Sequence, residues 1–249
     1  MPDIASFRVK IFADGADRAS ILELAGNPWI RGFTTNPTLM RKAGVTDYEA
    51  FGKSLAHAIP ERPFSFEVLS DDFDEMEGQA LRIASWGQNV YVKIPITDTR
   101  GRSTAGLVAR LAEQGVKVNV TALMTIEQVD AVVPALRHGP PSCISIFAGR
   151  VADTGRDPLP ILCGALARIR AYPEIELIWA SPRELFNIVQ ADEIGCHIIT
   201  VTHDLLRKLS LLGYDLNEYS LDTVKMFVSD ARAANFTLET SAALGLEKV

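Results

Sequence analysis

The stretch NVYVKIP, residues 89–95, has the composition of a buried β-strand, but it carries a lysine, Lys93, near its end. Seven other runs rich in β-branched or aromatic residues lie at 8–14, 31–36, 63–68, 116–121, 142–149, 174–181 and 196–203. Each run is followed by a segment with apolar residues at helical spacing, and several of these segments begin with Asp, Thr or Ser. The pattern predicts eight β-strands that alternate with α-helices.

The predicted strands follow one another at intervals of about 25 to 30 residues, with no domain-sized linker between them. Eight such units match a closed (β/α)8 barrel, also called a TIM barrel. An open doubly wound sheet would show a glycine-rich first turn, and ADGAD (13–17) is not GxGxxG. We therefore predict one barrel domain over residues 1–249, with an additional C-terminal helix at about 220–235 and a short tail.

The charge and composition narrow the class of partner. The net charge is -6 at a pI near 5.3, and no run of Lys or Arg predicts a nucleic-acid or membrane surface. Neither a signal peptide nor an apolar stretch of about 20 residues is apparent, so we expect a cytoplasmic protein. Cys143, Cys163 and Cys196 lie far apart in apolar contexts and are interpreted as reduced core cysteines.

Successive side chains of a strand point to opposite faces, so one phase of each strand points into the barrel. In residues 89–95, Val90, Val92 and Ile94 share one phase, while Tyr91 and Lys93 share the other. Nearly every strand carries a polar residue in the inward phase near its C-terminal end: Asp14, Thr34, Asn36, Glu67, Lys93, Asn119, Thr121, Ser145, Ser181, Thr200 and Thr202. Active sites of this fold lie at that end, so the pattern predicts a polar site there.

Lys93 has the strongest chemical meaning among these residues. A lysine amine shielded from water can have its pKa lowered from ~10.4 to roughly 7–8, and it then attacks a carbonyl group. The resulting imine permits cleavage of a neighbouring carbon–carbon bond, provided that a carboxylate accepts the proton of the leaving hydroxyl. Asp14 and Glu67 are the inward carboxylates. The alternative is a structural ion pair between Lys93 and one of them.

Eight motifs in strand order resemble the transaldolase family, in its short form related to the fructose-6-phosphate aldolases. They are FADGAD (12–17), GFTTNPTL (32–39), FEV (66–68), VYVKIPIT (90–97), VNVTALMT (118–125), ISIFAGRVADTG (144–155), ASPRE (180–184) and IITVTHDLL (198–206). The resemblance extends from about residue 10 to about residue 230. TTNPT and VKIP are the most specific motifs.

The resemblance implies roles for individual residues. Lys93 corresponds to the Schiff-base lysine, Asp14 to the acid/base aspartate, and Glu67 to a glutamate that acts through a water held by Thr121. Asn36, Asn119 and Ser145 correspond to residues that contact the dihydroxyacetone portion, and Phe147 to a pocket residue. Arg150, Ser181 and Arg183 correspond to the phosphate-binding group, which agrees with the suitability of guanidinium groups for phosphate.

The implied activity is transfer of a dihydroxyacetone unit from a ketose phosphate, such as sedoheptulose 7-phosphate or fructose 6-phosphate, to an aldose phosphate. This is transferase chemistry of carbohydrate metabolism and the pentose phosphate pathway, without a metal or cofactor. Glu67 and Phe147 resemble the transaldolase branch, because the aldolase branch commonly has Gln and Tyr there. The alternatives are an aldolase that releases free dihydroxyacetone, a transaldolase-like enzyme of a specialised pathway, and a barrel that binds sugar phosphates without turnover.

Two further stretches of the sequence bear on metal binding and on assembly. The carboxylates of SDDFDEMEG (70–78) lack the spacing of a calcium loop and are interpreted as the start of a helix. The C-terminal helix has Leu221, Val224, Met226 and Phe227 on one side, which could cover the barrel or bind a neighbouring subunit. Short members of the family commonly form rings, so the resemblance implies a homo-oligomer.

Overall fold

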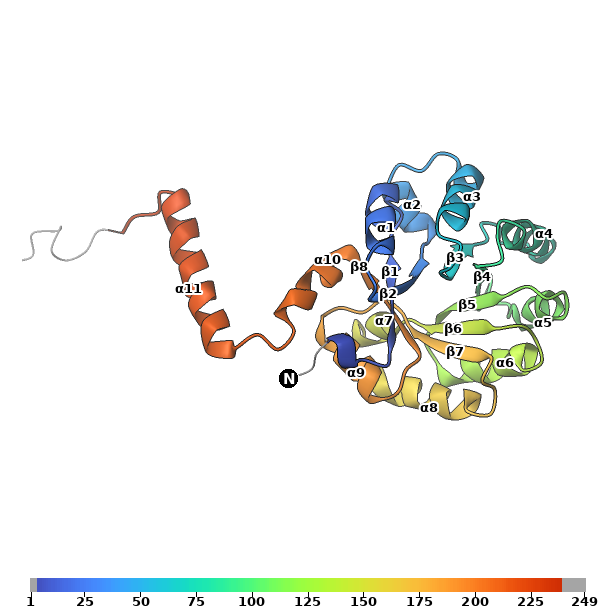
Figure 1. Cartoon of the computed structure of the whole chain (residues 1–249). Coiled ribbons are helices and arrows are strands. Elements are labelled where there is room, and N and C mark those ends of the chain that lie inside the picture. The colour runs from blue at the N-terminus through green and yellow to red at the C-terminus, as the bar shows by residue number, and fades with distance from the viewer. Residues whose placement is uncertain (1–3, 239–249) are drawn as a thin grey trace, which may run out of the picture. The chain divides into compact units, whose positions relative to one another are not determined.

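The computed structural model describes residues 4–238, and its strands form a closed parallel barrel in the order β1 to β8 (Figure 1). The strands are β1 (Lys10–Asp14), β2 (Ile30–Thr34), β3 (Phe64–Glu67), β4 (Val90–Pro95), β5 (Val118–Leu123), β6 (Ser142–Ile146), β7 (Ile175–Trp179) and β8 (Ile198–Thr202). The predicted (β/α)8 barrel is confirmed, and each strand falls within or close to its predicted run.

Helices lie between consecutive strands and cover the outside of the barrel. The helices between strands are α1 (Arg18–Ala25), α2 (Pro37–Lys42), α3 (Tyr48–Ala58), α4 (Phe73–Ala84), α5 (Ala105–Glu113), α6 (Ile126–Leu136), α7 (Ala148–Ala152), α8 (Leu159–Ile169) and α9 (Phe186–Glu193). The short helix η1 (Ile4–Ser6) precedes β1, and α10 (His203–Leu206) and η2 (Arg207–Leu211) follow β8. Several helices begin where a side chain satisfies free backbone amides. Asp72 accepts hydrogen bonds from the amides of Asp74 and Glu75, so the acidic stretch is a helix start, as predicted.

Two apolar clusters fill the barrel unit. The larger cluster lies between strands and helices and contains the outward residues of β4, Val90, Val92 and Ile94. A smaller cluster consists of the inward residues Phe12, Cys143, Ile178, Ala180 and Ile198, with Tyr91 and Phe147 packed against it. Gly32 makes room for the Phe12 ring, because a Cβ atom at this position would lie 2.5 Å from it. The inner cluster closes the barrel below the polar residues at the C-terminal strand ends.

Three details differ from the sequence-based expectations. The predicted run 31–36 is strand only to Thr34, because Asn36 caps the short helix α2. The run 142–149 ends at Ile146, and Phe147 is the N-cap of α7. The prediction of a core position for Cys163 was wrong. Cys143 and Cys196 are buried, but Cys163 lies exposed on α8. Its neighbours Leu162 and Ala165 in the ILCGAL stretch are buried on the other side of this amphipathic helix.

Within the described chain, residues 4–209 form one compact unit, and residues 210–238 belong to a second. The second unit contains α11 (Leu216–Ala233), which begins with Asp215 accepting hydrogen bonds from two backbone amides. Leu221, Val224, Met226 and Phe227 are exposed on this helix. Their role as a cover or subunit contact stays a prediction, and the tail at 239–249 lies outside the described residues. None of the helices in residues 4–238 is long and apolar enough to cross a membrane.

Candidate active site

A cavity of about 550 Å³ lies at the C-terminal ends of the strands. This volume is in the range typical of small-molecule sites. The cavity is lined by all the residues for which the sequence predicted a role: Asp14, Asn36, Glu67, Lys93, Asn119, Thr121, Ser145, Phe147, Arg150, Ser181 and Arg183. Residues from strands far apart in the sequence therefore meet in one place, and their chemical roles remain predictions.

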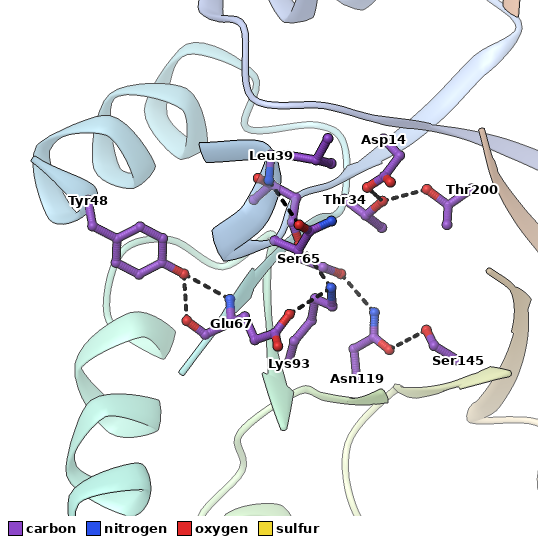
Figure 2. Close-up of polar contacts among 12 residues, drawn as sticks. Asp14, Thr34, Leu39, Tyr48, Ser65, Glu67, Lys93, Asn119, Ser145 and Thr200 are labelled. Atoms are coloured by element: carbon purple, nitrogen blue, oxygen red, sulfur yellow. Dashed lines mark hydrogen bonds and ion pairs between the residues drawn. The ribbon is translucent and has the colours of Figure 1, made fainter. Parts of the chain in front are cut away.

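Lys93 is buried at the end of β4, where its amine has two partners in the described part of the chain. Its Nζ atom lies 2.9 Å from Glu67 Oε2 (Figure 2). The same atom donates a hydrogen bond of 2.9 Å to the carbonyl oxygen of Thr35. Glu67 and Lys93 are direct partners in the β3–β4 register, which explains the short approach of their side chains. Of the two inward carboxylates, Glu67 forms the ion pair.

Asp14 lies at the end of β1 among hydroxyl groups. Thr34 donates a hydrogen bond of 2.7 Å to Asp14 Oδ1 and also contacts Thr200, as Figure 2 shows. Burial raises the pKa of Asp14, although the charge of Lys93 and the Thr34 hydrogen bond act in the opposite direction. The Asp14 carboxyl group therefore holds its proton to a higher pH than an exposed aspartate does.

Beside the cavity, strands β3, β5 and β6 carry an amide and three hydroxyl groups. Asn119 donates from Nδ2 to Ser65 Oγ at 3.1 Å, and Ser145 donates to Asn119 Oδ1 at 2.7 Å. These bonds fix the orientation of the Asn119 amide. The hydroxyl of Thr121 is buried and has no hydrogen-bond partner among the described residues. Such a group costs roughly 1–3 kcal/mol when unpaired, so a water or a ligand hydroxyl is its expected partner.

The predicted phosphate-binding residues come from the loops after β6 and β7. Arg183 is held by Asp153, with contacts of 2.9 Å and 2.5 Å, and it also donates to Ser181 Oγ at 3.0 Å. This hydrogen bonding to Asp153 raises the pKa of Arg183. Arg150 forms no ion pair or hydrogen bond through its side chain within residues 4–238, so its guanidinium group is available to an anion.

The backbone of α7 lies unusually close to the loop that follows β7. Ser181 has a φ of 61°, in the left-handed region. A Cβ atom at Gly149 would lie only 1.7 Å from the carbonyl oxygen of Ser181 and 3.2 Å from Cζ of Arg183. Glycine at 149 therefore allows α7 to contact the loop that carries Ser181 and Arg183.

Sequence reasoning missed two residues of the site. Lys42 at the end of α2 lines the cavity and forms no ion pair among the described residues. It follows the TTNPT motif at a helical position, and no strand periodicity marks it. Tyr48 at the start of α3 contacts the backbone of Glu67 through its hydroxyl. The apolar spacing of its helix gives no signal for this polar contact.

Solved structures that are similar to this chain define its fold class. An HpcH/Hpal aldolase/citrate lyase family protein from Burkholderia cenocepacia J2315 aligns with a TM-score of 0.57 at 13% identity, covering 88% of this chain and 95% of that one. A mandelate oxidase mutant aligns with a TM-score of 0.55 at 12% identity over 81% of this chain and 71% of its own. At such identities the likeness shows the fold alone, and the chain is a (β/α)8 barrel.

Sequence comparison then gives the family. Residues 11–247 match Transaldolase/Fructose-6-phosphate aldolase. A "Probable transaldolase" from Dehalococcoides mccartyi is 32% identical over 81% of this chain and 90% of its own length. A second "Probable transaldolase", from Thermoanaerobacter sp., is 33% identical over 87% of this chain and 95% of its own length. The chain belongs to the transaldolase/fructose-6-phosphate aldolase family.

Proposed function

We propose that this chain is a transaldolase that moves a dihydroxyacetone unit from a ketose phosphate to an aldose phosphate through an imine at Lys93. The observation that carries the proposal is the buried Lys93 amine, with Glu67 at 2.9 Å and Asp14 in the same cavity. Membership of the family and the predicted roles of the cavity residues support it further. Arg150 and Lys42 line the cavity and form no ion pair within residues 4–238, so their positive charges suit a phosphorylated substrate.

In the first step, Lys93 Nζ passes a proton to its ion-pair partner, the Glu67 carboxylate, and attacks C2 of the ketose. The nitrogen then gives a second proton to the former carbonyl oxygen, which becomes a hydroxyl. The Glu67 carboxyl group supplies a proton to that hydroxyl, either directly or through a water held by Thr121. Water then leaves, and a protonated imine remains. The imine draws electrons toward nitrogen and stabilises negative charge at C3. No other electron sink is needed for the next step.

In the second step, Asp14 removes the proton of the C4 hydroxyl, and the C3–C4 bond breaks. The C4 fragment leaves as an aldehyde, while the bonding electrons form an enamine between C2 and C3. The enamine adds through C3 to a second aldehyde, and Asp14 returns its proton to the new hydroxyl. Hydrolysis of the imine releases the product ketose phosphate and restores Lys93.

Borohydride trapping tests the proposal directly. The protein is incubated with fructose 6-phosphate and sodium borohydride, and the modified peptide is located by mass spectrometry. We expect the added mass at Lys93, and its loss in Lys93→Met. Lys117→Met is the matched control, since Lys117 is a half-buried lysine outside the cavity whose amine donates a hydrogen bond to the Gln88 carbonyl. Absence of added mass at Lys93 in the parental protein would contradict the proposal and indicate a barrel that only binds sugar phosphates.

Product analysis then separates transfer from simple cleavage. With fructose 6-phosphate and erythrose 4-phosphate, we expect a seven-carbon sugar phosphate and glyceraldehyde 3-phosphate. With fructose 6-phosphate alone, we expect little free dihydroxyacetone. Free dihydroxyacetone at the same rate with and without the acceptor would instead identify an aldolase.

A further inference from the structure

Strand β3 ends beside a gap in the hydrogen-bond ladder that joins it to β2. The carbonyl oxygens of Pro63 and Ser65 accept hydrogen bonds from the amides of Phe33, at 2.9 Å, and Thr35, at 3.2 Å. The backbone N–H and C=O groups of every second residue in a strand face the same neighbouring strand. The next acceptor in this series is the carbonyl oxygen of Glu67. The next donor position, in the segment that follows β2, is residue 37. That residue is proline, which has no backbone N–H, and it begins α2.

The phenol of Tyr48 takes the place of the missing strand partner. Its hydroxyl donates to the carbonyl oxygen of Glu67 at 2.6 Å and accepts from the amide of Glu67 at 2.8 Å (Figure 2). The ring is packed against Trp86, with centroids 5.6 Å apart in an edge-to-face arrangement. Burial raises the pKa of Tyr48, so the phenol keeps the proton that it donates.

We infer that Tyr48 is a positioning residue for the Lys93 imine: it completes the end of β3 and so holds the Glu67 carboxylate at the amine. The other neighbour of Glu67 in the sheet is Lys93 itself. Without the phenol, the backbone of Glu67 would have no partner on the β2 side, and the carboxylate would lose its fixed distance of 2.9 Å from Nζ. This inference rests on the proposed function, because it assigns Glu67 the delivery of a proton during imine formation.

The test follows imine formation without any carbon–carbon bond cleavage. Dihydroxyacetone is added with borohydride, and the initial rate of modification of Lys93 is measured by mass spectrometry. Tyr48→Phe removes the hydroxyl and keeps the ring on Trp86. We expect the trapping rate to fall about tenfold, equivalent to about 1.4 kcal/mol. Tyr172→Phe is the matched control, since no hydrogen bond of its hydroxyl is present in the described structure, and we expect the parental rate for it.

A double-mutant cycle distinguishes positioning from general support of the fold. If Tyr48 acts through Glu67, Tyr48→Phe has little further effect on the trapping rate in a Glu67→Gln background. A tenfold effect in both backgrounds, or a parental rate in Tyr48→Phe with only a lower unfolding midpoint, would overturn the inference. Failure of the parental protein to be trapped would refute the proposed function instead, so the two failures are distinguishable.

Discussion

Replacing Gly149 by alanine should weaken recognition of phosphorylated substrates while leaving imine chemistry intact. The added Cβ atom would lie 1.7 Å from the carbonyl oxygen of Ser181, whereas ordinary contact begins at 3.4 Å, so the two must separate by about 3.4 − 1.7 = 1.7 Å. The backbone of residue 149 fixes the position of the Cβ atom, and the oxygen belongs to the backbone of Ser181. Rotation of a side chain therefore cannot relieve the contact. The loop that carries Ser181 and Arg183 must therefore shift relative to α7.

The expected magnitude follows from that shift. A displacement of about 1 Å in a group that positions substrate can lower the rate about 100-fold. We expect kcat/KM for fructose 6-phosphate to fall by about that factor, mostly through KM. Overpacking of this kind costs about 1–3 kcal/mol of stability, which leaves a protein of this size folded.

Two assays on the same variant make the prediction specific. Turnover of fructose 6-phosphate reports on the phosphate-binding loop, and borohydride trapping of unphosphorylated dihydroxyacetone at Lys93 reports on imine chemistry alone. Gly78→Ala is the control, because a Cβ atom at Gly78 on α4 meets nothing within 4 Å. Parental turnover in Gly149→Ala would refute the reasoning. An equal loss in both assays would refute it too, because the damage would then not be confined to phosphate recognition.

Three other perturbations have expected outcomes. In Asp14→Asn, turnover should fall at least 100-fold. The folded state raises the pKa of Asp14, so ionisation of this group destabilises the fold as pH rises above the ordinary aspartate pKa of 3.8. The unfolding midpoint of Asp14→Asn should thus exceed the parental value at pH 7, with a smaller difference at pH 4. Thr121→Val removes a buried hydroxyl without a described protein partner, so dihydroxyacetone trapping should slow at no loss of thermal stability. Lys42→Gln should raise KM for fructose 6-phosphate about fivefold, as expected for one exposed charge contact, with trapping of dihydroxyacetone unchanged.

Strand periodicity was sufficient to predict where Lys93, Asp14 and Asn119 meet. Side chains alternate along a strand, and parallel strands end at the same edge, so polar residues in the inward phase must converge at the barrel mouth. This rule does not extend beyond the strands. Asn36 was assigned to the end of a strand, yet its Oδ1 atom caps α2 by accepting from the amide of Leu39.

Contacts between helices and strand ends could not be predicted in the same way. The bond between Tyr48 and Glu67 depends on how α3 lies against β3, and the pair formed by Arg183 and Asp153 depends on the close approach of two loops. Neither has a periodic signal. The glycine that permits the second contact, Gly149, lies within the FAGR sequence, but its need for a missing Cβ atom becomes visible only in three dimensions.

In the proposed mechanism, the two carboxylates of the cavity serve different proton transfers. Glu67 Oε2 lies 2.9 Å from the amine of Lys93, so its proton is delivered where the imine forms. Asp14 has hydroxyl groups as its neighbours, and burial raises its pKa, so it can take up a proton from a sugar hydroxyl and hold it while the first aldehyde leaves. Asp14 must keep that proton while the enamine waits for a second aldehyde. The hydroxyl that forms from this aldehyde then receives the proton. The assignment of Asp14 and Glu67 to different protons is thus what the proposed two-substrate reaction on one amine requires.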